Sequence, residues 1–191
     1  MEERISSEYD AYRESLFDIV DFYVLNSPVP EASRRGMTFA ELGWRNGKLN
    51  TLQALMKRVS TVDVRWICDK QTTIQGHLER LQTDGKTREH AVYAKGWSKG
   101  KNDTKTNALF YGIRCAFAHG GFRIFEDAGE TWYELENRHH DTVRGHFQLK
   151  EATLREWMKL VRAGPDSSYA LNLRGKGHSH QKKAGRKTGH T

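Results

Sequence analysis

Apolar residues recur at intervals of three and four along most of this chain, and this spacing restricts the fold more than any other feature. Between residues 8 and 26, Tyr12, Leu16, Ile19, Val20, Tyr23 and Val24 fall on one face of a helix. The same spacing predicts further helices over residues 50–59, 63–81, 106–118 and 150–162. The first helix should end before Pro28, because proline lacks an amide hydrogen and disfavours helix in the residue before it. The pattern predicts a mostly helical domain.

Other segments lack this spacing. Residues 122–125 and 131–135 are short β-like runs on either side of a turn at 127–130, which predicts a hairpin. Residues 86–105 contain six basic and two acidic residues and predict a polar connection that is helical only at 88–94. We expect one helical domain over residues 1–165 and a basic, disordered tail over 166–191, because the tail has too few apolar residues to order itself.

The net charge of +7 and the pI near 9.4 favour a polyanionic partner. Six basic residues and no acid occur in residues 170–191, so the excess lies almost wholly in the tail, which either adds affinity for RNA or keeps the chain soluble. The two cysteines, Cys68 and Cys115, lack zinc-site spacing, and no apolar run approaches the roughly 20 residues that span a bilayer. We therefore expect a cytoplasmic protein with no cofactor, no metal and no membrane contact.

The segment at 107–121 is the most informative for chemistry. At about 100° per residue, Leu109, Phe110, Ile113, Ala116 and Phe117 share one arc of a helix that must face the core. The opposite arc holds Asn107, Tyr111, Arg114, Cys115 and Ala118, with His119 at its edge. Gly120 and Gly121 predict the helix end. A mostly polar patch with an arginine and a histidine thus lies on the back of an apolar helix.

Arg114 and His119 are suited to phosphodiester chemistry. A guanidinium is always charged and matches two phosphate oxygens through its planar fork. A histidine exchanges protons near neutral pH. The two residues point about 140° apart around the helix axis, but a long arginine side chain and a fraying last turn can bring both heads to one phosphate. The alternative is a purely structural role, in which Arg114 forms a surface ion pair and His119 caps the helix.

Residues 113–120, Ile-Arg-Cys-Ala-Phe-Ala-His-Gly, resemble the Arg-x4-6-His motif of HEPN-domain ribonucleases. The resemblance implies an all-α, up-and-down helical bundle, here with a small β-hairpin insertion, that forms a homodimer with the site at the interface. It also implies metal-independent cleavage of single-stranded RNA by the 2′-hydroxyl. Arg114 would stabilise the developing phosphorane charge and His119 would transfer protons, in a toxin or defence effector with an antitoxin or regulatory partner.

One position departs from the family pattern. Where the family often has Asn, Asp or His after the arginine, this chain has Cys115, and a thiol is a poor hydrogen-bond partner. The alternative is a noncatalytic HEPN module that binds RNA, a nucleotide or a protein; a purely structural protein is a third. The spacing alone is not specific, because Arg174 and His180 also match it within the tail.

Two further groups merit attention. The residues Tyr93, Lys95, Trp97, Lys99 and Lys101 combine charge with aromatic rings and could guide single-stranded RNA, or else form a solvated loop with one ring in the core. His139, His140 and Asp141 resemble a metal-ligand fragment, but between a hairpin and a helix a solvated turn is the better interpretation. The leading prediction is a HEPN-type endoribonuclease with Arg114 and His119 as catalytic residues and Asn107, Tyr111 and Cys115 in support.

Overall fold

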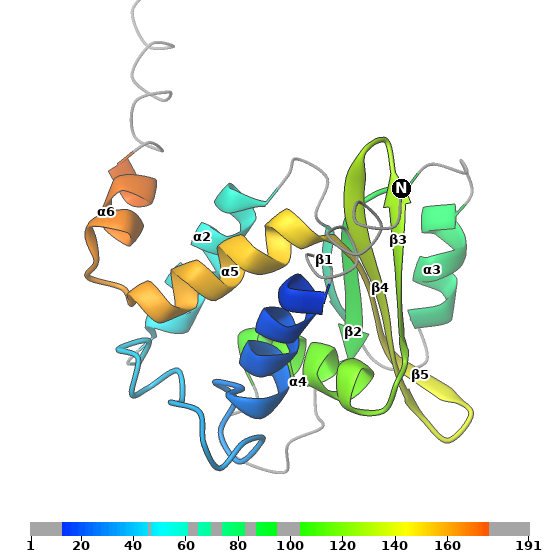
Figure 1. Ribbon diagram of the computed structural model, residues 1–191, viewed down its shortest axis with the longest axis horizontal. Helices are drawn as coiled ribbons and strands as arrows, with labels where there is room; N and C mark the ends of the chain where they lie inside the picture. The colour runs from blue at the N-terminus through cyan, green and yellow to red at the C-terminus, as the bar shows by residue number, and fades with distance from the viewer. Residues whose placement is uncertain are drawn as a thin grey trace, which may run out of the picture.

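The computed structural model describes residues 13–45, 47–60, 65–69, 74–82, 87–94 and 104–175. Its centre is a five-stranded sheet, so the predicted all-α class is wrong (Figure 1). The strands are β1 (Arg65–Asp69), β2 (His90–Ala94), β3 (Phe122–Asp127), β4 (Glu130–His139) and β5 (Thr142–Lys150). Their order is β1-β2-β5-β4-β3; β1 and β2 are parallel and the other neighbours are antiparallel.

Helices lie on both faces of this sheet (Figure 1). A helix over residues 13–20 continues as the π-helical turn η1 (Asp21–Leu25), and it packs on one side of the sheet with α2 (Lys48–Val59), α4 (Lys105–Ala118) and α5 (Glu151–Ala163). The helix α3 (Ile74–Gln82) packs on the other side, where Ile74 and Leu78 contact Val92 and Ala94 of β2. The main core therefore lies between the sheet and the larger helical layer.

Buried aromatic residues hold the larger helical layer together. Trp44 and Trp157 are almost fully buried, and their indole N–H groups donate to the carbonyl oxygens of Val161 (2.9 Å) and Met56 (3.2 Å). The hydroxyl of Tyr23 donates to the carbonyl oxygen of Leu154 at 3.0 Å. Each contact removes a large apolar surface from water while it satisfies a polar group, so the helices are joined at fixed points.

Two glycines set the position of α4 against the sheet. A Cβ atom at Gly112 would lie 2.6 Å from the ring of Phe147 on β5, and one at Gly121 would lie 2.3 Å from the carbonyl oxygen of Glu136 on β4. The amide of Glu136 also donates to the carbonyl oxygen of Gly121 at 2.7 Å. The absence of side chains at these positions lets the helix and its C-terminal turn approach the sheet closely.

The predictions for three helices and the hairpin are confirmed: α2, α4 and α5 lie within two residues of the expected ranges, and β3 and β4 form the hairpin. Three predictions are wrong. The expected helix at 63–81 is strand β1 followed by the shorter α3, and the expected helix at 88–94 is strand β2. The segment between hairpin and last helix is strand β5, not a loop.

Part of the expected disordered tail is ordered. Residues Ser168–Gly175 form helix α6, which contacts α2 and α5. Ala170 is fully buried, and the guanidinium of Arg58 donates to the carbonyl oxygen of Leu173 at 2.7 Å. One buried small residue and a backbone contact from α2 hold this short helix in place. The rest of the tail, residues 176–191, lies outside the described residues.

Candidate active site around helix α4

Helix α4 starts and faces the core as its sequence predicts. The hydroxyl of Thr104 accepts a hydrogen bond from the amide of Asn107 at 3.1 Å, which caps the first turn. The core-facing arc is buried along its whole length, from Leu109 to Phe117. The polar arc is therefore fixed in direction, because rotating the helix would expose these apolar side chains.

The polar arc is not an open surface. Asn107 and Cys115 are buried, Tyr111 and Arg114 are half-buried, and only Ala118 and His119 at its end are exposed. Asn107 lies at the first turn and the exposed imidazole at the last, so Asn107 is not close along the helix to His119. Of the supporting residues named from sequence, Tyr111 and Cys115 remain next to Arg114.

Within the described ranges, Arg114 lacks the contacts expected of a structural arginine. Its Nε atom is buried and has no hydrogen-bond partner, and no carboxylate in the described part of the chain forms an ion pair with it. A buried guanidinium N–H without an acceptor is costly, because the group loses water and gains nothing in return. An anionic ligand would supply the missing acceptor.

His119 occupies the C-cap position without using its side chain. The amides of Gly120 and Gly121 donate to the carbonyl oxygens of Phe117 (3.2 Å) and Ala116 (2.8 Å), and Gly120 has a φ of 71°. This is a Schellman motif, in which backbone groups alone satisfy the last carbonyls of the helix. The imidazole is exposed and has no hydrogen-bond partner within the described ranges, so it is open to a ligand.

A second arginine reaches the same arc from the sheet. Arg144 of β5 interacts electrostatically with Tyr111 and Cys115. The pKa of Tyr111 is raised, chiefly by its interaction with Cys115 and by burial, while the charges of Arg114 and Arg144 act in the opposite direction. Two guanidinium groups from different elements thus lie near one phenol and one thiol.

The turn between β4 and β5 adds two imidazole groups near Arg144. The rings of His139 and His140 are 4.3 Å apart between centroids, and both side chains are exposed. The pKa of His139 is lowered by desolvation and by the positive charges of Arg144 and His140. These residues form a solvated turn, as expected, but their position beside Arg144 could not be predicted from their spacing.

Comparison with protein-family models, curated proteins and solved structures found no match. No helix in the described ranges is long and apolar enough to cross a membrane. No group of three or more metal-ligating side chains occurs among these residues either.

The basic segment at 86–105 is placed only in part. Tyr93 is 1% exposed, and its ring stacks on Phe147 within the sheet. It therefore packs in the core and cannot act as a stacking platform for RNA in this structure. Lys95, Trp97, Lys99 and Lys101 lie outside the described residues.

Sequence reasoning missed a second polar arrangement, on the sheet face that α3 covers. His90 of β2 and His146 of β5 are 6% and 8% exposed, and their Nε2 and Nδ1 atoms are 2.9 Å apart. Nδ1 of His90 lies 3.1 Å from the carbonyl oxygen of Arg88. Nε2 of His146 lies 3.2 Å from Oε1 of Glu134 on β4, which also pairs with the exposed Arg123. Only the strand register, β2 next to β5 and β5 next to β4, could have revealed this chain of contacts.

The number of protons in this histidine chain is limited. The pKa of Glu134 is lowered, since its contacts with Arg123 and His146 outweigh burial, so the carboxylate accepts hydrogen bonds only. The pKa of His146 is also lowered, because burial outweighs the attraction to Glu134. The chain has three contacts, from the Arg88 carbonyl through His90 and His146 to Glu134, and both of its ends only accept. Each contact needs one N–H group, whereas two neutral imidazoles carry two in total. While both imidazoles are neutral, one of the three contacts therefore lacks its proton.

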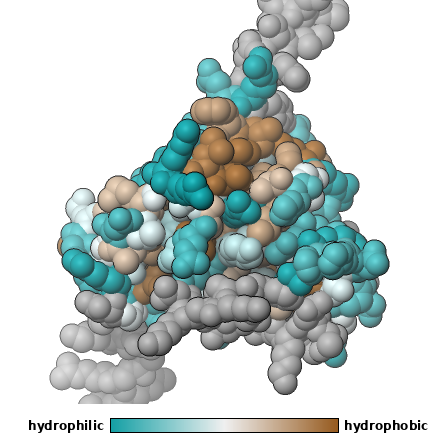
Figure 2. All heavy atoms as spheres, turned by 90° about the horizontal axis from the view of Figure 1, so that it is seen from below, coloured by the Kyte–Doolittle hydropathy of each residue, from teal (hydrophilic) through white to brown (hydrophobic). Residues whose placement is uncertain are grey.

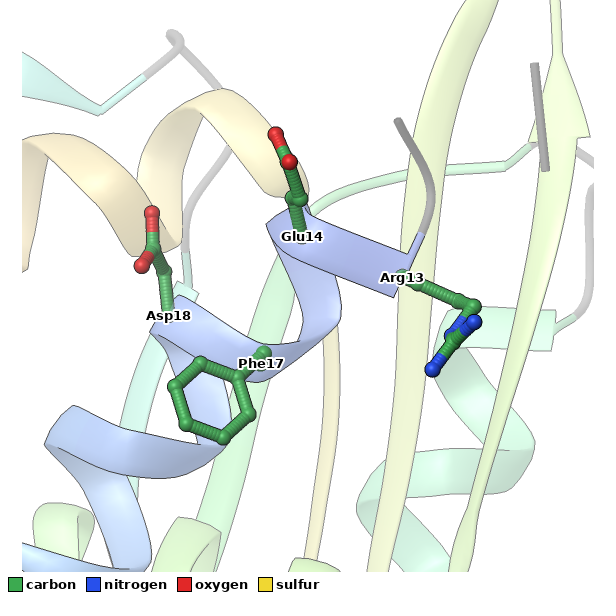
Figure 3. Close-up of a pocket in the computed structure, with 4 residues that line it drawn as sticks. All are labelled: Arg13, Glu14, Phe17 and Asp18. Atoms are coloured by element: carbon green, nitrogen blue, oxygen red, sulfur yellow. The ribbon is translucent and has the colours of Figure 1, made fainter. Parts of the chain in front are cut away.

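One surface hollow lies elsewhere, on the N-terminal helix, and is lined by Arg13, Glu14, Phe17 and Asp18 (Figure 3). The carboxylates of Glu14 and Asp18 point to one side, while the heads of Arg13 and Phe17 point in other directions. Because these groups do not converge on one point, the hollow offers no arrangement for catalysis.

Proposed function

We propose that this chain is a metal-independent endoribonuclease that cleaves single-stranded RNA at helix α4. The observation that carries the proposal is the state of Arg114, whose half-buried guanidinium has no anionic partner among the described residues and which lies five residues before the exposed His119. The resemblance to HEPN ribonucleases rests on this helix alone, because the sheet removes the support that an all-α bundle would have given.

The two structural alternatives, a surface ion pair for Arg114 and a helix cap for His119, lose support. A surface ion pair would give Arg114 a carboxylate partner, and no described acid pairs with it. A capping role would engage the imidazole of His119, yet backbone amides already satisfy the helix end. Both side chains are available for a ligand that is anionic and exchanges protons.

The proposed reaction is an in-line transfer within the RNA. The 2′-oxygen forms a bond to phosphorus, the bond from phosphorus to the 5′-oxygen breaks, and the products are a 2′,3′-cyclic phosphate and a 5′-hydroxyl. Arg114 holds the nonbridging oxygens, on which negative charge increases in the transition state. His119 removes the proton from the 2′-hydroxyl or returns one to the leaving oxygen.

Pairing of two chains is part of the proposal. The reaction moves two protons, and a second copy would bring a second imidazole to the phosphate. The chain has surface that association would cover: large apolar side chains such as Phe17 and Met37 are 66% and 55% exposed. On the face shown in Figure 2, hydrophilic side chains surround one apolar area. Such areas are common at protein interfaces.

The test is incubation of the purified chain with end-labelled single-stranded RNA in EDTA. We expect products with cyclic phosphate ends, and a loss of rate of about 100-fold or more in Arg114→Ala and in His119→Ala, the usual contribution of a general acid–base or oxyanion-stabilising group. The matched control is Arg174→Ala with His180→Ala, which removes the other copy of the motif and should leave the rate unchanged.

Two results would contradict the proposal in different ways. RNA binding without products would favour the noncatalytic module, with Cys115 marking the position where the site departs from the family. Cleavage that persists equally in Arg114→Ala and His119→Ala would place the activity elsewhere or in a contaminant. Light scattering at micromolar concentration tests the pairing, and a monomeric mass during full activity would remove that part.

A further inference from the structure

Arg114 and His119 lie on different sides of α4, and strand β5 lies near the part of the helix surface between them. Relative to Tyr111, Arg114 lies about 60° to one side around the helix axis, and Cys115 and His119 lie about 40° and 80° to the other side. The sector between the arginine and the histidine is therefore the stripe that begins with Tyr111 and Cys115. The residue that interacts with both is Arg144 of β5.

A β-bulge directs Arg144 toward the helix. In the pairing of β4 with β5, Asn137 is opposite Gly145 and Arg138 is opposite Val143, so Arg144 is the extra residue. Bulges interrupt the alternation of a strand and re-aim a side chain. Here Val143 packs on the α3 side of the sheet with Val92, whereas Arg144 interacts electrostatically with Tyr111 and Cys115 of α4.

The packing of the helix on the strand fixes this placement. Gly112, next to Tyr111, lies against the ring of Phe147, and Gly145, next to Arg144, lies against the same ring. The strand around Gly145 and the helix around Gly112 are thus in close contact. The backbones at Arg144 and Tyr111 are therefore held close to each other by the packing of α4 on the sheet.

We propose that Arg144 is a third phosphate-binding residue of the RNA site, placed by the β-bulge between Arg114 and His119. This inference rests on the function proposed above and adds a residue that the motif does not contain. Each guanidinium binds one nonbridging oxygen of the scissile phosphodiester, so the phosphate lies over Tyr111. A phosphate in this position also lies on the side of the helix that faces His119.

The substrate class follows from this arrangement. Two half-buried guanidinium groups on one phosphate favour a ligand whose backbone can approach the surface closely, and a single strand can do so more readily than a duplex. The contacts are to the backbone, which carries no base information. The chain should therefore bind single-stranded RNA with little sequence preference at the cleaved phosphate.

The experiment measures the affinity of a fluorescent single-stranded RNA by anisotropy over a range of salt concentrations, with cleavage measured in parallel. Arg144→Gln keeps the side-chain stem but removes the charge, and we expect a loss of affinity of about tenfold or more for one charge-assisted contact. The slope of log affinity against log salt should decrease by about 0.7 for the lost phosphate contact. Arg144→Lys should restore the slope but only part of the affinity, since lysine lacks the planar fork.

Arg138→Ala is the matched control. Arg138 is an exposed arginine on the same hairpin, but its charge is already paired with Glu136. It should alter neither affinity nor salt slope. Thermal melts of the Arg144 variants show whether they are folded, and Arg144→Lys keeps the test valid if Arg144→Gln does not fold.

The outcomes separate this inference from the proposed function. If Arg114→Ala loses binding and cleavage while Arg144→Gln keeps the wild-type affinity and salt slope, the role of Arg144 is overturned and the nuclease stands. If Arg144→Gln loses affinity and Arg114→Ala does not, Arg144 binds the phosphate and the motif assignment fails. If the wild-type chain binds no RNA at low salt, both are overturned.

Discussion

The histidine chain gives the sharpest prediction about this fold, through the substitution Glu134→Gln. The prediction takes both imidazoles as neutral at pH 8, so each carries one N–H. The Arg88 carbonyl and the Glu134 carboxylate only accept, so if His90 donates to the carbonyl and His146 to the carboxylate, no N–H is left for the contact between the two rings. A glutamine amide at position 134 can donate an N–H to His146. His146 then donates to His90, and His90 to the Arg88 carbonyl, so every contact becomes a hydrogen bond.

The expected effect is an increase in stability. A contact between two acceptors in a site as buried as His146 leaves a polar group unsatisfied at a cost of about 1–3 kcal/mol, and the glutamine removes this cost. The substitution also removes the ion pair with Arg123, whose side chain is 70% exposed, and such pairs contribute about 0–1 kcal/mol. The free energy of unfolding should therefore rise by about 1 kcal/mol, or about 2–4 °C in Tm for a chain of this size.

The assay is urea unfolding at pH 8, with Glu136→Gln as the control. Glu136 lies two residues along the same strand and pairs with Arg138 outside the histidine chain, so its substitution should change stability by less than about 0.5 kcal/mol. A loss of more than about 1 kcal/mol in Glu134→Gln alone would refute the reasoning. It would mean that the chain holds an extra proton at pH 8 and that an imidazolium pairs with the carboxylate.

The acid sensitivity of the fold and the approach of α4 to the sheet give two further predictions. Burial lowers the pKa of His146 below 6.5, so the unfolded chain binds this proton more readily than the folded chain does. The contribution of His146 to stability is therefore complete above pH 6.5 and is lost as the pH falls below it. The pKa of Glu134 is lowered from 4.5, so a second loss of stability follows below that pH. Denaturant unfolding between pH 8 and pH 4 checks the sign, and a stability that rises on acidification would contradict it. Gly121→Ala places a Cβ atom 2.3 Å from the Glu136 carbonyl oxygen and should lower the free energy of unfolding by about 1–3 kcal/mol. The control is Gly76→Ala in α3, where the Cβ atom meets nothing within 4 Å. In the same thermal melt this control should be neutral or stabilising. Equal melting temperatures for these two variants would show that α4 is not held at Gly121.

The helices that pack on one face and the hairpin of β3 and β4 were predictable, and the rest of the sheet was not. Helices α2 and α5 each bury one stripe, so their spacing of three and four is visible in the sequence. Helix α4 is buried on more than one side, but its large apolar side chains still fall on one arc. Strand β2 is buried at every position from His90 to Ala94, because it lies between two strands and beneath helices on both faces. A strand buried on both sides shows no alternation, and a short apolar run of this kind cannot be told from a helix by its period.

Strand β5 was missed for a different reason. Phe147 and Leu149 are buried and alternate with His146 and Gln148, which is the period of a strand. The bulge at Arg144 breaks this alternation in the middle, and Gly145 weakens it further. The same irregularity that hid the strand is the feature that directs Arg144 toward α4.

The candidate site was predictable along the helix and not across it. Arg114 and His119 follow from the period of one helix and from the glycines that end it. Arg144, His139 and the histidine chain depend on which strands are neighbours and in which register, and this information is not local in sequence. A pattern within one element can therefore name residues of a site, but the partners from other elements require the sheet.

The sheet also limits how a second copy can approach the proposed site. In a bundle without strands, the whole polar stripe of α4 would face solvent or a partner chain. Here β5 already lies against the stripe near Tyr111 and Cys115, while Ala118 and His119 at its end remain exposed. A partner could therefore contribute its imidazole only from the C-terminal end of the helix. In this arrangement Arg144 takes the place, within one chain, of a charge that a purely helical dimer would have to supply from its second copy.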